Sequence, residues 1–196
     1  PLTPIQLTID RLKSKYSEKL NTDEKDDFSK NLKIIIKQIK QIENLVNEFS
    51  DFARMPKPIF KDNDLVLIAK DNINLMQELD VNIKFEFNFS ESEVILISDS
   101  EQLSRVFLNI IKNSIESIQE KSLKLANFVG KIDIEINNDD DYIDFIVTDN
   151  GIGFGDLRTN IKKILNPYFT TKKKGTGLGL SIVNKIINDH NGKINF

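Results

Sequence analysis

Cysteine and tryptophan are absent from this sequence of 196 residues, and histidine occurs once, at His190. Without cysteine the chain cannot form disulfides, a catalytic thiolate or a zinc ribbon, and this absence is typical of proteins in a reducing compartment. A single histidine also excludes metal centres that need several histidines. These absences remove the thiol-based and histidine-rich classes of site.

Long apolar runs and a strong excess of one charge are also missing. No apolar run approaches the roughly 20 residues that a membrane-spanning helix needs. The 27 Lys and Arg against 30 Asp and Glu give a net charge of −3, which does not indicate a nucleic-acid binder. With 39% hydrophobic and 29% charged residues, the chain can bury a core. We therefore expect a folded protein that binds no nucleic acid.

Apolar residues recur at helical spacing in two stretches of residues 1–55. The two stripes are Ile5, Ile9, Leu12, Tyr16 and Leu20, and then Phe28, Leu32, Ile35, Ile39, Ile42, Val46, Phe49 and Ala53. The polar run Asn21–Asp27 lies between them and predicts a turn. A two-helix hairpin has too little core to bury both stripes, so we expect two hairpins to pair into a four-helix bundle, or the hairpin to dock on the rest of the chain.

Two prolines, Pro56 and Pro58, end the second helical pattern, because each restricts itself and the residue before it. We therefore predict a hairpin over residues 1–55, a hinge at 56–58 and a second domain over 59–196. In that domain the patterns predict helices at 64–79, 99–119 and up to 188, with strands at 81–87, 93–98, 131–137, 142–148 and from 193. The acidic run 138–141 is predicted to be a solvated hairpin tip rather than a metal site.

Four short segments of the second domain contain residue types suited to a nucleotide. Asn109 and Asn113 lie one turn apart on a predicted helix, and carboxamide oxygens suit Mg²⁺ that also binds phosphate. The run Asp149–Gly153 follows a predicted strand; its carboxylate can accept a hydrogen bond from an exocyclic amine, and its glycines let backbone approach a flat ring. Taken alone, either segment is equally typical of a surface helix or an ordinary turn.

The other two segments are rich in hydroxyl groups, lysine and glycine. Pro167–Lys172 offers hydroxyls and an ammonium group to phosphate oxygens. Gly175–Leu180 opens a predicted helix with alternating glycines, which leaves backbone N–H groups for an anion. Its spacing fits neither the G-x-G-x-x-G fingerprint nor the P-loop, so Rossmann and Walker sites are disfavoured.

Taken together, in this order and at these separations, the four segments resemble the N, G1, F and G2 boxes of the GHKL nucleotide-binding superfamily, and within it the sensor histidine kinases. The helical region is similar as well. Pro1–Leu7 resembles the segment that follows the phosphoacceptor motif His-Glu-Ile-Lys-Asn, and Leu45–Pro56 resembles the end of the second dimerisation helix of nitrogen-regulation kinases. The resemblance therefore covers nearly the whole chain.

This resemblance implies an α+β fold, with a helical hairpin that is half of a dimeric four-helix bundle, followed by a two-layer α/β sandwich of the GHKL (Bergerat) type. It implies ATP and Mg²⁺ as cofactors, with Asn113 as the Mg²⁺ ligand, Asn109 as a second candidate, and Asp149 as the acceptor for the adenine amine. The ATP-binding residues that it implies are Asn109, Lys112, Asn113, Asp149, Gly151, Ile152, Gly153, Phe169, Thr170, Thr171, Lys172, Gly175, Thr176, Gly177, Leu178 and Gly179.

The function implied is the cytoplasmic catalytic core of a histidine kinase, which transfers the γ-phosphoryl group of ATP to a histidine for relay to a response-regulator aspartate. The implied partners are a second copy, through residues 1–55, and a receiver domain, with membrane attachment only through upstream segments of the parent. The alternatives are a GHKL-type ATPase and a non-catalytic nucleotide-sensing dimerisation module. Gyrase-type relatives have a glutamate at position 109 that activates water; Asn109 cannot act as a base, which favours the kinase.

The sequence also departs from the family pattern. It begins at Pro1 and has no signal peptide, so we expect a piece of a longer protein, with the acceptor histidine upstream and a last strand beyond Phe196. His190 matches a structural position, so we expect that this chain does not phosphorylate itself. Many relatives have a basic residue where this chain has Glu116, which leaves one phosphate contact without its usual donor.

Overall fold

The computed structural model describes residues 3–17, 20, 22–77, 82–139, 141–155, 161–172 and 175–196. The chain divides into two compact units, Pro1–Met55 and Pro56–Phe196. Within the described ranges, no helix is both long enough and apolar enough to cross a bilayer.

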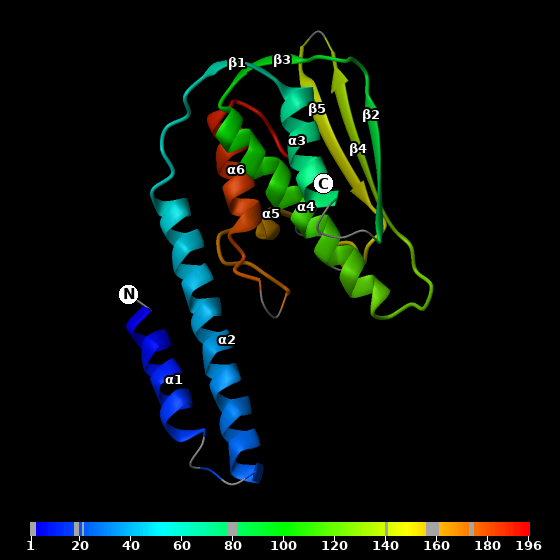
Figure 1. The fold of residues 1–196 in the computed structure, drawn as a ribbon. Helices are drawn as coiled ribbons and strands as arrows, with labels where there is room; N and C mark the ends of the chain where they lie inside the picture. Colours follow the sequence, from blue (N-terminus) through cyan, green and yellow to red (C-terminus); the bar gives the residue numbers. More distant parts are fainter. Residues whose placement is uncertain are drawn as a thin grey trace. The chain divides into compact units, whose positions relative to one another are not determined.

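The first unit contains two helices, α1 over Thr3–Tyr16 and α2 over Thr22–Ala53 (Figure 1). Their shared core is small: Ile9, Leu32 and Ile39 are buried, and Phe28 and Ile36 pack against them. The prediction of a turn over 21–27 was wrong for residues 22–27, because α2 already begins at Thr22. Acidic residues such as Glu24 are favourable in the first turn of a helix, where the macrodipole is positive, so a polar run there extends the helix.

Most of the predicted apolar stripe of this unit is exposed. On α2 the exposed large members are Ile35, Ile42, Val46 and Phe49, and on α1 they are Ile5, Leu12 and Tyr16. Val46 is 54% exposed and Phe49 is 50% exposed. A contiguous apolar face of this kind marks an interaction surface.

The second unit has a helical layer on one face of a mixed sheet (Figure 1). The helices are α3 over Leu65–Gln77, α4 over Ser100–Ser122 and α6 over Gly179–Asp189. The sheet has the order β2-β4-β5, with β2 over Ile83–Phe89, β4 over Gly130–Asn138 and β5 over Ile143–Asp149. Strand β2 is parallel to β4, and β4 is antiparallel to β5. The predicted α+β fold is confirmed.

Strand β4 provides the centre of the core. Its alternate residues Ile132, Ile134 and Ile136 are fully buried, as the period of two in a strand requires when one face of the sheet is covered. Helix α4 covers them with a stripe that includes Phe107 and Ile111, and the Phe107 ring meets the Phe145 ring edge-on at 4.3 Å between centroids. The helix that contains both candidate asparagines is thereby fixed on the sheet.

The opposite, open face of the sheet bears charged side chains. The Lys131 ammonium lies 3.0 Å from Glu86 and 2.8 Å from Asp133, and the Lys84 ammonium lies 2.8 Å from Glu86. Hydrogen bonds from Lys84 and Lys131 lower the pKa of Glu86 to about 2. These pairs are solvent-exposed, so they favour solubility more than stability.

Several elements differ from the prediction. Strand β1 over Lys61–Asp64 was not predicted, because its residues are polar; it pairs antiparallel with β3 over Ile95–Ser98, and the Asn63 side chain donates to the Ser98 carbonyl at 2.8 Å. The one-turn helix α5 over Ile161–Ile164 was not predicted either.

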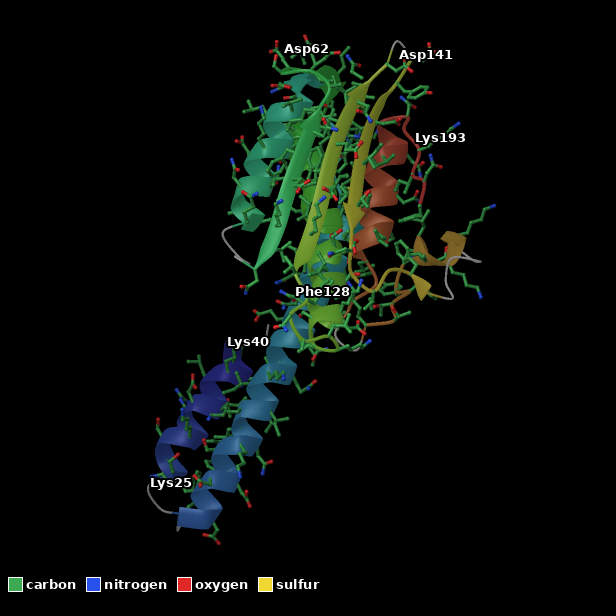
Figure 2. All side chains as sticks on the ribbon, turned by 90° about the vertical axis from the view of Figure 1, so that its right-hand side faces the viewer. Lys25, Lys40, Asp62, Phe128, Asp141 and Lys193 are labelled. Atoms are coloured by element: carbon green, nitrogen blue, oxygen red, sulfur yellow. The ribbon has the colours of Figure 1, made fainter. Side chains whose placement is uncertain are left out.

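The strand predicted from Lys193 is not formed, and residues 193–196 are irregular. In place of a ladder, the Phe196 ring lies edge-on to the Phe154 ring at 5.3 Å between centroids. The acidic run does form a hairpin tip: the Asp139 amide donates to the Tyr142 carbonyl at 3.0 Å, and Figure 2 shows Asp141 at the end of the β4–β5 hairpin. Asp140 and residues 78–81, where a helix end and a strand start were predicted, lie outside the described ranges.

Helix α4 begins at a capping carboxylate, that of Asp99. One Asp99 oxygen accepts from the Gln102 amide at 3.0 Å and the other accepts from the Ile59 amide at 2.8 Å. Partial burial alone would raise the pKa of Asp99, but these backbone hydrogen bonds outweigh it and lower the pKa below the ordinary 3.8. The carboxylate thus links the start of the second unit to the helix that positions the site.

This cap predicts an acid-dependent stability difference. Because the folded pKa of Asp99 lies below its unfolded value, its charge stabilises the fold above the unfolded pKa, and that contribution is lost as the pH falls through the folded pKa. Asn in the Asp99→Asn variant can still cap the helix, so we expect wild type to be more stable by up to about 1 kcal/mol at pH 7 and by a smaller margin at pH 3, as the pH falls toward the lowered pKa of Asp99. Urea unfolding at both pH values measures the difference; an equal gap at pH 7 and pH 3 would contradict the cap.

Candidate functional site

One face of α4 contains the first of the four segments with predicted nucleotide-binding residues and contacts the other three. Asn109, Asn113, Glu116 and Ser117 lie on it at helical spacing, and Lys121 continues it by one turn. These side chains are half-buried, so they are fixed by their neighbours yet still accessible. Helix α4 is therefore the element around which the site is built.

The first segment against α4 is the loop 149–153, which follows β5. The Ile152 amide donates to the Ser117 carbonyl at 3.3 Å, and the Gly153 amide lies 3.4 Å from the Ser117 hydroxyl oxygen. The Lys121 ammonium donates to the Gly151 carbonyl at 3.2 Å and also to the Asn150 carbonyl. Two residues of α4 thus hold this loop in place.

Asp149 is the last residue of β5 and is half-buried. Its Oδ1 accepts from the Gly151 amide at 2.9 Å, which turns the chain sharply after the strand. A Cβ at Gly151 would collide with Ser117, and Gly153 has a φ of +65°, a conformation that favours glycine. The glycines therefore allow a close approach between this loop and α4, with the Asp149 carboxylate at its edge.

The second contact region joins the segment Pro167–Lys172 to the glycine loop Gly175–Gly179. The Tyr168 amide donates to the Gly177 carbonyl at 3.0 Å, and the Gly175 amide donates to the Lys172 carbonyl at 3.2 Å. Gly177 has a φ of +72°, and a Cβ there would lie 2.7 Å from the Phe169 amide nitrogen and carbonyl oxygen. The two segments, which are adjacent in sequence, therefore form one structure that requires glycine at position 177.

The glycine loop leads directly into α6, whose first residue lies beside the asparagines of α4. A Cβ at Gly179 would lie 3.0 Å from Asn109 Oδ1 and 3.9 Å from Asn113 Nδ2. The Asn109 amide group donates to the Arg105 carbonyl at 2.8 Å, which orients its oxygen toward Gly179. The start of a helix, with its outward backbone N–H groups, thus lies next to two carboxamides.

Lys172 connects the third segment to α4. Its ammonium donates to Asn113 Oδ1 at 3.1 Å and to Glu116 Oε2 at 2.5 Å. A carboxamide oxygen of α4 therefore faces the ammonium group of a lysine from a different segment.

The remaining predicted residues lie on the same segments with differing exposure. Lys112, Ile152, Thr170 and Thr171 are exposed, whereas Phe169, Thr176 and Gly177 are half-buried and Leu178 is fully buried. Leu178 is therefore a core residue that anchors the start of α6.

Sequence reasoning missed three features: the anchoring by Ser117, the anchoring by Lys121, and the pairing of Glu116 with Lys172. The anchoring by Ser117 and Lys121 could have been predicted from the sequence. Positions 113, 117 and 121 repeat every four residues, so they share one face of a helix whose opposite side is apolar. The ion pair joins residues 56 positions apart and leaves no local signal.

His190 contributes to structure at the other end of α4. Its Nε2 accepts from the Asp99 amide at 3.0 Å, and its Nδ1 lies 2.8 Å from the Ile186 carbonyl oxygen. These contacts correspond to a neutral ring with the proton on Nδ1. The Phe60 ring also lies edge-on to it at 5.1 Å.

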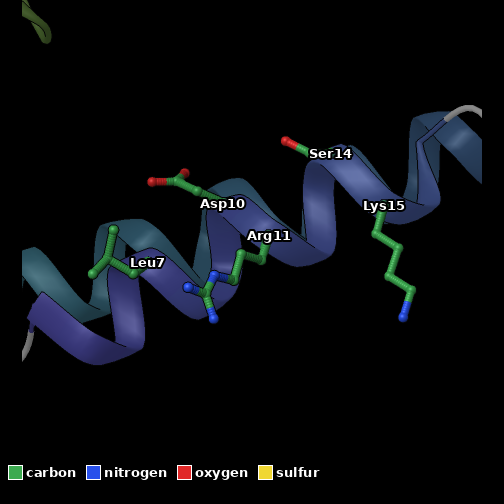
Figure 3. A pocket seen from close by; sticks show the side chains of 5 residues that line it. All are labelled: Leu7, Asp10, Arg11, Ser14 and Lys15. Atoms are coloured by element: carbon green, nitrogen blue, oxygen red, sulfur yellow. The ribbon is translucent and has the colours of Figure 1, made fainter.

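A surface hollow in the first unit is unrelated to these segments. It is lined by Leu7, Asp10, Arg11, Ser14 and Lys15, all on α1. Figure 3 shows Asp10 and Ser14 pointing away from Arg11 and Lys15, so the polar groups do not converge on a common point. The convergent arrangement is the one on α4, which combines a carboxylate, two carboxamides, an ammonium and a helix N-terminus.

Comparisons with known proteins agree with this arrangement. Residues 98–196 match the family described as histidine kinase-, DNA gyrase B-, and HSP90-like ATPase, and residues 1–58 match the His Kinase A (phospho-acceptor) domain. A putative sensor histidine kinase NtrY-like of Rickettsia prowazekii is 38% identical over 192 residues, which is 98% of this chain and 30% of that protein. The nitrogen regulation protein NtrY of Azorhizobium caulinodans is 35% identical over 99% of this chain and 24% of that protein. The chain thus spans under a third of these relatives.

Solved structures show the same fold. The catalytic domain of histidine kinase ThkA superposes with a TM-score of 0.56 at 30% identity, covering 67% of this chain and 82% of that chain. Histidine kinase ThkA in complex with the response regulator protein TrrA superposes with a TM-score of 0.66 at 23% identity, covering 97% of this chain and 52% of that chain. The second comparison supports the fold across both units.

Proposed function

Because this chain belongs to the sensor histidine kinases, with a HisKA segment and a histidine kinase-type ATPase segment, we propose that residues 56–196 bind ATP with Mg²⁺ around α4 and transfer its γ-phosphoryl group to a histidine. The observation that carries this proposal is the convergence of three of the four segments on the face of α4 that contains the fourth. The alternatives, an ATPase or a nucleotide-sensing module, lack a comparable observation.

The adenine base is proposed to bind at the loop 149–153. Asp149 is half-buried, and its Oδ1 is already oriented by the Gly151 amide. The carboxylate can therefore accept a hydrogen bond from the exocyclic amine of adenine, while Gly151, Ile152 and Gly153 form the wall beside the ring.

The phosphates are proposed to bind between α4, the segment Pro167–Lys172 and the glycine loop. Backbone N–H groups at the start of α6 favour anions, and Lys172 supplies a positive charge. Asn113 is the residue that would hold Mg²⁺, with Asn109 beside it, and the ion would neutralise phosphate charge when bound. Phosphoryl transfer depends mainly on this positioning and charge neutralisation.

Transfer to a protein, rather than hydrolysis, is supported by position 109. Its amide group donates to the Arg105 carbonyl and its oxygen faces Gly179. A carboxamide cannot accept a proton from water near neutral pH, so it cannot generate the nucleophile that an ATPase needs.

The acceptor is proposed to be a histidine in a His-Glu/Asp-x-Lys/Arg segment upstream of Pro1, and not His190. Both ring nitrogens of His190 are engaged, one with Asp99 and one with Ile186. A neutral imidazole needs a nitrogen lone pair for attack on phosphorus, and the Nε2 lone pair of His190 is already used.

Calorimetric titration with ATP tests the proposal directly. We expect binding in the presence of Mg²⁺ and much weaker binding when the metal is chelated, because the phosphate charges then lack a counter-ion. GTP serves as the comparison nucleotide, since it presents a carbonyl oxygen where ATP presents an amine. Equal affinity for ATP and GTP would contradict the placement of Asp149, and no binding of ATP at all would refute the proposed function.

Pairing of two chains through residues 1–55 is also proposed, with a response-regulator receiver domain as a further partner on the cytoplasmic side. The HisKA match and the exposed stripe on α2 support the pairing. The complex of the related kinase ThkA with the response regulator protein TrrA motivates the second partner.

Light scattering after size exclusion tests the pairing. At micromolar concentration we expect a mass near twice 22.5 kDa for wild type. Val46→Glu places a charge in the exposed apolar stripe and is expected to lower the dimer fraction at least tenfold, because a buried unpaired charge is costly. Lys33→Glu, at an exposed polar position of the same helix, is the matched control and should leave the mass unchanged. A wild-type monomer at this concentration would overturn the four-helix bundle.

A further inference from the structure

The ion pair between Lys172 and Glu116 lies at the edge of the proposed phosphate site, and its interpretation rests on the function proposed above. Glu116 lies one turn after Asn113 on α4, three positions along the chain. An acidic side chain at the edge of a phosphate site is unfavourable by itself, since it repels the phosphates. Its presence there needs a structural reason.

The contacts of Lys172 provide this reason. Its ammonium is held by two oxygens of α4, Glu116 Oε2 at 2.5 Å and Asn113 Oδ1 at 3.1 Å. The Glu116 carboxylate is thus neutralised by a lysine that comes from a different segment. The ammonium is at the same time brought to the carboxamide that would ligate Mg²⁺.

The backbone of Lys172 is also fixed. Its amide donates to the Thr170 hydroxyl at 3.1 Å, and its carbonyl accepts from the Gly175 amide at 3.2 Å. The side chain therefore extends from a defined turn across to α4, and Glu116 determines where its charged end stops. The side chains of Lys172 and Glu116 are 35% and 37% exposed, so an incoming anion can reach the ammonium.

We infer that Glu116 is a positioning residue: it holds the Lys172 ammonium beside Asn113, so that the cation which meets the phosphates at this end of the site comes from the segment Pro167–Lys172 and not from α4. When Mg²⁺ and ATP bind, two cations cannot share Asn113 Oδ1, and Lys172 moves from Asn113 to the phosphates while Glu116 keeps it close.

If nucleotide binding depends on the position of the ammonium group and not on the residue that supplies it, a lysine on α4 should be able to replace Lys172. A lysine side chain extends further than a glutamate side chain, and the Lys172 ammonium lies only 2.5 Å from the Glu116 carboxylate oxygen. An ammonium at the end of a lysine at position 116 would therefore occupy nearly the same place.

Calorimetry with ATP and Mg²⁺ on the full chain provides the first test. Lys172→Met should weaken affinity about tenfold, as expected for the loss of a charge-assisted contact. The double variant Glu116→Lys/Lys172→Met should recover to within about threefold of wild type. Glu120→Lys/Lys172→Met makes the same charge change one turn further along α4, where Glu120 pairs with Lys124 in solvent, and should show no recovery.

Nuclear magnetic resonance of the nucleotide-free protein provides the second test. The side-chain amide signal of Asn113, assigned with Asn113→Ala, should shift in both Glu116→Gln and Lys172→Met, because each releases the ammonium from Asn113 Oδ1. It should not shift in Glu120→Gln. An unshifted signal in Glu116→Gln, or equal recovery of affinity by the changes at 116 and 120, would overturn the inference. Wild-type protein that binds no ATP would refute the proposed function instead, and the nucleotide-free signal would still report on the ion pair.

Discussion

Asn113→Ala is expected to weaken the affinity for ATP with Mg²⁺ about 100-fold, the largest effect of any single side-chain truncation on α4. The change removes the oxygen that would ligate the metal ion, and loss of a group that only supports a metal ligand already costs about 10- to 100-fold in affinity. It also removes the acceptor that now holds the Lys172 ammonium at 3.1 Å. Calorimetry at saturating Mg²⁺ measures the loss.

The matched control is Asn74→Ala, an exposed asparagine on α3. It should leave nucleotide affinity within about twofold of wild type. Because Asn113 is only half-buried, thermal unfolding without nucleotide should show both variants folded. An affinity of Asn113→Ala for ATP equal to that of wild type would show that Asn113 does not ligate the metal ion.

Asp149→Asn is expected to lower ATP affinity roughly 10- to 100-fold, the usual range for loss of a hydrogen bond to a charged group. Asn can still accept from the Gly151 amide, as Asp149 does at 2.9 Å. Its amide nitrogen would then face the adenine amine, which places a donor against a donor. The loop should therefore stay folded while recognition of the base is lost.

Two comparisons make this result specific. GTP has a carbonyl oxygen at the corresponding ring position, so the preference for ATP over GTP should shrink or reverse in Asp149→Asn. Asp144→Asn, at an exposed position on the same strand, should change neither affinity. An unchanged ratio of ATP to GTP affinity in Asp149→Asn would show that this carboxylate does not contact the base.

Much of the second unit could be predicted because its apolar residues follow regular periods. The alternation of apolar and polar residues predicted β4, and its apolar members Ile132, Ile134 and Ile136 are buried. The apolar stripe that includes Leu103 and Phe107 predicted α4. Strand β1 could not be predicted, because Lys61–Asp64 has no apolar alternation and is held by pairing with β3. The start of α2 was placed too late, since the polarity of residues 22–27 was taken for a turn while acidic residues also favour a helix N-terminus.

The site was predictable as a list of residues but not as a set of contacts. The order of the four segments identified Asn113, Asp149 and the glycines, and the positive φ of Gly153 and Gly177 gives a physical reason for two of them. The pairing of Lys172 with Glu116 joins residues 56 positions apart and depends on tertiary folding. No local sequence pattern indicates this ion pair, because the residues adjacent to Lys172 and to Glu116 in the sequence do not distinguish either of them from a solvent-exposed charge.

This chain is proposed to be a phosphotransferase core whose acceptor histidine is not among its own 196 residues. The most direct measurement extends the chain so that His-Glu-Ile-Lys-Asn immediately precedes Pro1, then adds ATP labelled at the γ-phosphate with Mg²⁺. We expect acid-labile, alkali-stable label on the extended chain, none when Gln replaces the added histidine, and none on the unextended chain. Label on the unextended chain that is lost in His190→Gln, or no label on an extended chain that binds ATP normally, would contradict this proposal.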